Sequence, residues 1–193
     1  IIVSAAITTK GGSLDFNAGD DITVNANLTT AGGAIDLDAA DDITIANSVA
    51  LSSGSGNLIL DADDAISTGN GSSFSTTSGR IEFTSGNSTL LGNSSQFTTT
   101  GGNITLNSGN DLTVGNNSSF DSAGGTLSLI AGDDLDITNN ATDFLDGPLR
   151  KESAHQVHDC SNDDKRGAHQ TAHQQEARQR CKHNVADFDI ADI

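Results

Sequence analysis

Residues 99–117 read TTGGNITLNSGNDLTVGNN, and this stretch recurs in altered form along most of the chain. Related segments are TTAGGAIDLDAADDITIANS at 29–48 and AGGTLSLIAGDDLDITNN at 123–140. One glycine per repeat sets the period, 21 residues once and then 23 residues four times: Gly12, Gly33, Gly56, Gly79, Gly102 and Gly125. A fixed period of about 20 to 50 residues is typical of a solenoid, propeller or array. We therefore expect about six stacked units.

Each repeat contains two short segments in which apolar and polar residues alternate. After Gly102 the apolar pairs are Ile104 with Leu106, and Leu112 with Val114. A period of two is typical of a strand with one buried face. A third inward position recurs every 23 residues, at Leu51, Phe74, Phe97 and Phe120. The sequence therefore predicts an all-β fold, a right-handed parallel β-solenoid (β-helix) of 21–23-residue, three-sided coils with three stacked phenylalanines inside.

The predicted turns carry columns of their own. The clearest has a spacing of 23 residues: Asn47, Asn70, Asn93, Asn116 and Asn139. Asparagine tolerates left-handed backbone geometry and bonds to neighbouring backbone groups, so this column predicts a ladder of side chains bonded along the solenoid axis. A second corner is marked by Gly86, Gly109 and Gly132, where a positive φ would be inexpensive for glycine.

Charge separates the repeats from the end of the chain. The chain has 26 acidic residues against 9 Lys and Arg, and Lys10 and Arg80 are the only basic residues before Pro148. Nucleic-acid affinity comes largely from Lys and Arg, so the acidic repeats disfavour DNA and RNA as partners. The sequence contains no apolar run of the roughly 18 residues that indicate a membrane-spanning helix. We therefore expect a soluble or surface-displayed protein that is not inserted in a membrane.

The repeat pattern ends near Gly147, which divides the chain into a solenoid domain at 1–147 and a tail at 148–193. We expect the tail to be poorly ordered and partly helical. It holds all five histidines and both cysteines, and ligand types suited to zinc occur at His169, His173, Cys181 and His183. The irregular spacing favours a solvated helix, a linker or an out-of-frame end over a zinc site. A cap on the last coil is a further alternative.

Paired acids mark another predicted corner: Asp20 and Asp21, Asp41 and Asp42, Asp63 and Asp64, and Asp133 and Asp134. A feature repeated in several coils is more typical of a structural turn than of a singular site. Calcium is the alternative, with Asp41, Asp42, Asp133 and Asp134 as candidate ligands, although the Gly-rich nonapeptide of calcium β-rolls is absent. We expect no cofactor.

The repeats are poorly supplied with catalytic groups. Before Pro148 they contain no His or Cys, and the whole chain contains no Tyr. A lyase needs a base and a cationic group, and a glycoside hydrolase needs two carboxylates in unlike settings. A repeated acid pair lacks the singular environment that separates two pKa values. We therefore do not expect an enzyme.

The three quoted segments resemble the repeats of filamentous haemagglutinin-like exoproteins, large adhesins exported by two-partner secretion, and of related autotransporter passengers. The resemblance covers about residues 8–140. It implies a secreted, outer-membrane-associated rod, continued by flanking coils of a longer chain, which attaches to receptors or glycans on host cells, bacteria or matrix surfaces. The alternatives are a fragment of a carbohydrate-active parallel β-helix enzyme and a calcium-stabilised surface-layer or biofilm matrix module.

Overall fold

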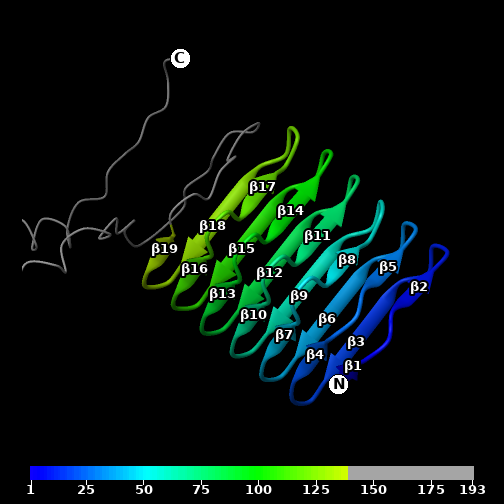
Figure 1. The fold of residues 1–193 in the computed structure, drawn as a ribbon, viewed down its shortest axis with the longest axis horizontal. Helices are drawn as coiled ribbons and strands as arrows, with labels where there is room; N and C mark the ends of the chain where they lie inside the picture. Colours follow the sequence, from blue (N-terminus) through cyan, green and yellow to red (C-terminus); the bar gives the residue numbers. More distant parts are fainter. Residues whose placement is uncertain (139–193) are drawn as a thin grey trace, which may run out of the picture.

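The computed structural model describes residues 1–138, which form an all-β parallel solenoid of about six coils (Figure 1). This part of the chain contains no helix. Each full coil contributes one strand to each of three parallel sheets, and the coils follow one another along a single axis (Figure 1). The predicted fold class is therefore confirmed, and so is the three-sided coil.

The first sheet has seven short strands. In its three-residue strands the middle side chain points outward and lies between two neighbours that point inward. Its strands are β1 (Ile2–Val3), β4 (Ile22–Val24), β7 (Ile43–Ile45), β10 (Ile66–Thr68), β13 (Thr89–Leu91), β16 (Leu112–Val114) and β19 (Leu135–Ile137). The register is that of the repeat, because Ile43 pairs with Ile22 one coil before and with Ile66 one coil after. The same offset explains why one sequence column becomes one row on the surface.

The other two sheets have six strands each. The second sheet contains β2 (Ile7–Thr9), β5 (Leu28–Thr30), β8 (Ala50–Ser52), β11 (Ser73–Thr76), β14 (Gln96–Thr99) and β17 (Ser119–Asp121). The third contains β3 (Leu14–Ala18), β6 (Ile35–Ala39), β9 (Leu58–Ala62), β12 (Ile81–Ser85), β15 (Ile104–Ser108) and β18 (Leu127–Ala131). Burial alternates along each strand, so every sheet turns one apolar face inward.

The predicted phenylalanine stack is present inside the coils. Phe74, Phe97 and Phe120 lie with ring centroids 4.8 Å apart at each step and with interplanar angles of 24° and 14°. Phe83 reaches the stack from the third sheet and packs edge-on against Phe74 at 4.9 Å. Such aromatic pairs contribute roughly 0.5–1.5 kcal/mol each beyond the area they bury. The contacts of Phe83 with the stack therefore join the third sheet to the second in the later coils.

The stacked column begins earlier than the sequence reading proposed. Leu51 pairs with Phe74, Leu28 pairs with Leu51, and Ile7 pairs with Leu28. Leu28 and Leu51 are fully buried. Leu51 was predicted as a member of this column, whereas Ile7 and Leu28 were not.

The glycine corner is present, but the reason given for it from the sequence was wrong. Gly86, Gly109 and Gly132 do not have positive φ. A Cβ added at Gly109 would instead lie 2.0 Å from the carbonyl oxygen of Gly86 in the preceding coil, and one at Gly132 would lie 1.8 Å from the oxygen of Gly109. Close approach between stacked backbones, rather than backbone conformation, requires glycine at this corner.

Hydroxyl groups close the turn that joins the second sheet to the third. Ser53 donates to the carbonyl oxygen of Gly56 at 2.7 Å, and Ser122 donates to that of Gly125 at 3.0 Å, so a buried side chain at the end of each strand holds the glycine three residues on. Among residues 1–138, every buried side-chain nitrogen and oxygen has a hydrogen-bond partner. The polar part of the interior therefore carries no unpaired group.

Candidate functional site

The predicted asparagine ladder joins consecutive coils. The side-chain oxygen of Asn47 accepts from the backbone N–H of Asn70 at 2.7 Å, Asn70 accepts from Asn93 at 2.8 Å, and Asn93 accepts from Asn116 at 2.8 Å. Asn139 lies outside the described residues. Each side chain thus satisfies a backbone donor one coil further on, and the ladder is structural.

The left-handed position of this corner is one residue later than the sequence reading placed it. Positive φ occurs at Ser48, Gly71, Ser94 and Asn117. These residues are spaced 23 residues apart, but serine, glycine and asparagine all occur among them. The ladder asparagines therefore contribute a side-chain oxygen acceptor, and the left-handed backbone conformation belongs to the residue that follows each of them.

The paired acids lie at the corner that leads into the first sheet, and there the second acid of the first two pairs, like the single acid Asp111, bonds to the next coil. The Asp21 carboxylate accepts from the N–H of Asp42 at 3.2 Å, Asp42 accepts from Ala65 at 3.0 Å, and Asp111 accepts from Asp134 at 3.3 Å. These bonds support the structural interpretation of the pairs. They run between coils rather than within one turn.

Two groups of three carboxylates gather at this corner. In the first group Asp20, Asp21 and Asp41 have ligand oxygens within 4.8 Å of one another, and in the second Asp41, Asp42 and Asp64 do so. Asp64 joins because the third acid pair is displaced by one residue, so that Asp64 aligns with Asp41.

Of the calcium candidates from the sequence, Asp41 and Asp42 are therefore brought together with further acids. Asp133 and Asp134 belong to no such group within residues 1–138. Nothing besides the acids themselves points to an ion at either group.

Desolvation, together with the crowding of acids on the early coils, raises several pKa values. Partial desolvation, followed by the charges of Asp42 and Asp21, raises the pKa of Asp41 above its ordinary value. Desolvation together with neighbouring carboxylates also raises the pKa of Asp36 and of Asp61 on the third sheet. Each of these carboxylates thus favours its protonated form more in the folded chain than in the unfolded one.

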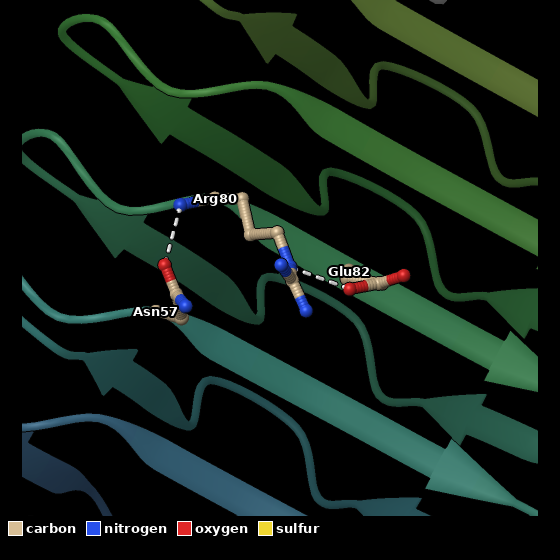
Figure 2. Close-up of polar contacts among 3 residues, drawn as sticks. All are labelled: Asn57, Arg80 and Glu82. Carbon is tan, nitrogen blue, oxygen red and sulfur yellow. Dashed lines mark hydrogen bonds and ion pairs between the residues drawn. The ribbon is translucent and has the colours of Figure 1, made fainter.

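One cation partly offsets this field on the third sheet. Figure 2 shows Arg80, whose Nε lies 2.6 Å from a carboxylate oxygen of Glu82, while its backbone N–H donates to Asn57 at 3.1 Å. The charge of Arg80 also acts to lower the pKa of Asp36. Because both side chains are partly exposed to water, the ion pair contributes little to stability, on the order of 0–1 kcal/mol.

Charge is distributed unevenly around the rod, which is the feature that sequence reasoning missed. Five acids project from the third sheet: Asp15, Asp36, Asp38, Asp61 and Glu82. Nine more occupy the corner between the third sheet and the first: Asp20, Asp21, Asp41, Asp42, Asp63, Asp64, Asp111, Asp133 and Asp134. Only Asp121 and Asp136, in the last described coil, lie elsewhere within residues 1–138.

The second sheet is in consequence uncharged from β2 through β14. The signal was available in the sequence, because assigning every acid to its place within the coil gives the same division. Total net charge alone conceals it.

The zinc candidates His169, His173, Cys181 and His183, and the expected boundary at Gly147, lie outside the described residues. In the part of the chain that is described, no helix is long and apolar enough to cross a membrane. No family model, curated protein or solved structure matches this chain.

Proposed function

We propose that the chain is an adhesive rod segment of a secreted or surface-displayed bacterial adhesin, which binds through rows of side chains repeated along its axis and performs no catalysis. The observation that carries the proposal is the unbroken register of the three sheets, which places outward side chains of corresponding positions in line from coil to coil. A surface of this kind offers many weak contacts in a row. Multivalent contact of this sort produces strong overall attachment from individually weak bonds.

The internal bonding of the rod supports a mechanical role. Stacked rings, the asparagine ladder and the inter-coil bonds of the acid corner all link one coil to the next. In solenoids stability is close to a sum over such neighbouring contacts, so the rod can be extended by adding coils. The resemblance of the repeats to filamentous haemagglutinin-like adhesins supports the same role and an exported location.

Adhesion of coated beads tests this proposal. The purified chain is coupled to polystyrene beads, which are then applied to epithelial cells, to bacterial biofilm and to immobilised matrix polysaccharide. We expect adhesion to at least one surface, and we expect added soluble protein to compete with it. Beads carrying Ile104→Pro serve as the control, because this change removes an inter-coil donor and disrupts stacking. Adhesion no greater than that of albumin-coated beads on every surface would contradict the proposal.

A further inference from the structure

From β2 to β14, the outward side of the second sheet is a strip of mostly short, uncharged side chains, nearly all of them polar. One row along the axis consists of Thr8, Thr29, Ser52, Ser75 and Thr98, whose strands pair in that order, and it ends at Asp121 in β17. A parallel row consists of Ala50, Ser73, Gln96 and Ser119. All of these residues are exposed or half-buried, while their strand neighbours Leu51, Phe74 and Phe97 point into the core.

The chemistry of this strip suits a partner rich in hydroxyl groups. Serine and threonine hydroxyls and the Gln96 amide can both donate and accept hydrogen bonds, as sugar hydroxyls do, whereas the carboxylates of the third sheet can only accept when ionised. The strip also avoids the cost of desolvating a charge. The first sheet also turns hydroxyls outward, at Thr23, Thr44, Ser67 and Thr113, but in a single row that the exposed Leu90 interrupts. The second sheet therefore offers a neutral, hydroxylated partner the wider matching surface on the described rod.

The charges elsewhere on the rod exclude other classes of polymer from the strip. The formal net charge of the chain is -17, so an anionic polysaccharide is repelled as it approaches. A cationic polymer is drawn instead to the third sheet and its acidic corner. An uncharged polymer is neither repelled by the acidic sides of the rod nor drawn to them.

The dimensions favour a single polymer strand over a second copy of this protein. The five strands from β2 to β14, about 4.8 Å apart and each about four residues wide at roughly 3.3 Å per residue, give an uncharged strip of about 300 Å². A stable protein interface needs about 800 Å² on each partner. A long, narrow strip matches an extended polysaccharide lying along the rod axis.

Building on the proposed adhesive role, we infer that the second sheet is its contact surface and that its ligand is a neutral polysaccharide. The phenylalanines of β11, β14 and β17 are buried, so these strands present no aromatic ring on which a sugar could stack. Each sugar therefore contributes little, and binding depends on the number of coils engaged at once. Polymers are expected to bind measurably where short oligosaccharides do not.

Affinity electrophoresis in native gels tests the inference with polymers of matched backbone. Hydroxyethylcellulose, galactomannan and dextran are the neutral probes, and carboxymethylcellulose is the charged counterpart of the first. We expect retardation by at least one neutral polymer, no retardation by carboxymethylcellulose, and no competition from the corresponding disaccharide. Absence of retardation by all three neutral polymers would overturn the inference.

Two variants locate the contact surface. Ser75→Asp and Thr98→Asp place a charge in the strip, and each is expected to weaken retardation at least fivefold. Thr113→Asp, on the outward side of the first sheet, is the matched control and is expected to leave retardation unchanged, with circular dichroism confirming that all three variants fold. Equal loss in the Thr113→Asp variant would contradict the assignment to the second sheet.

The bead assay separates this inference from the proposal on which it rests. If beads carrying Ser75→Asp or Thr98→Asp still adhere, and neutral polymers cause no retardation, the adhesive role is supported. The assignment of the second sheet as contact surface is then contradicted. If beads carrying the unmodified chain adhere to no surface, both the adhesive role and the contact surface assigned to it are contradicted.

Discussion

The early and late coils of the rod share one backbone register but fill it with different side chains. Through Asp64 the column on the second sheet is aliphatic, with Leu28 and Leu51 inside, and acid pairs crowd the corner before the first sheet. From Ser73 onward the same column holds stacked phenylalanines, and glycines press against one another at that corner. The register thus tolerates exchange of entire columns, provided that inward positions remain apolar and each backbone donor finds an acceptor in a neighbouring coil.

The aromatic core should give the late coils the larger dependence on single side chains. Phe97→Ala is expected to lower the free energy of unfolding by about 3–5 kcal/mol through loss of burial and creation of a cavity. Leu51→Ala, in the same column of the early coils, should cost about 1 kcal/mol less, because no aromatic pairs are lost. Urea denaturation followed by circular dichroism measures both, and equal costs would show that the ring contacts add nothing to burial.

The glycine corner separates the late coils from the first coil in the same sense, because Gly109 faces a backbone carbonyl of the preceding coil and Gly19 faces none. Gly109→Ala should cost about 3 kcal/mol, because its Cβ would meet the Gly86 carbonyl oxygen at 2.0 Å. Gly19 occupies the equivalent corner of the first coil with nothing within 4 Å, so Gly19→Ala should change stability by less than about 0.5 kcal/mol. Thermal melts of the two variants decide this, and a neutral Gly109→Ala would mean that the coils are less closely stacked.

The asparagine ladder runs through both regions and should matter in each. Asn93→Leu is expected to cost about 1–3 kcal/mol, because the N–H of Asn116 loses its acceptor. Asn93→Asp keeps an oxygen at the same place and should recover most of that stability. If both replacements leave the melting temperature unchanged, the column is only a feature of composition.

The acidic early coils should give the rod a small, distinctive pH dependence. The raised pKa values of Asp36, Asp41 and Asp61 mean that the folded state binds protons more readily than the unfolded state. Their unfavourable contribution is therefore absent below the unfolded pKa, near 3.8, and develops as the pH rises through the folded pKa values.

Asp41→Asn removes one of these charges and should raise stability slightly at pH 7 but not at pH 3. Melting temperatures at both pH values test this. A calcium-induced rise in melting temperature that Asp41→Asn abolishes would contradict the view that the corner is a site of simple repulsion.

Much of the architecture could be predicted from the sequence because each structural column is also a column of residue type. The phenylalanine stack and the asparagine ladder were predicted for this reason. The left-handed residue of the ladder corner was not, since Ser48, Gly71, Ser94 and Asn117 share a conformation without sharing a residue type. The role of Gly109 was not predicted, because it depends on the distance between the backbones of two stacked coils. The sequence of one coil does not give that distance.

The neutral strip was missed for a different reason. Ser52, Ser75 and Thr98 are unremarkable in sequence and gain meaning only when compared with the acids on the other sides of the coil. Net charge describes the whole chain, whereas binding depends on which side of the rod carries the charge.

Nuclear Overhauser effects between coils test the central claim, that aligned side chains recur at the repeat spacing along parallel sheets. In the isotopically labelled chain, we predict contacts between the rings of Phe74 and Phe97 and between those of Phe97 and Phe120, together with backbone contacts joining residues 23 positions apart, such as Ser75 and Thr98. Contacts that instead join strands adjacent in sequence in antiparallel register would contradict the solenoid, and with it the repeated surface from which both proposals derive.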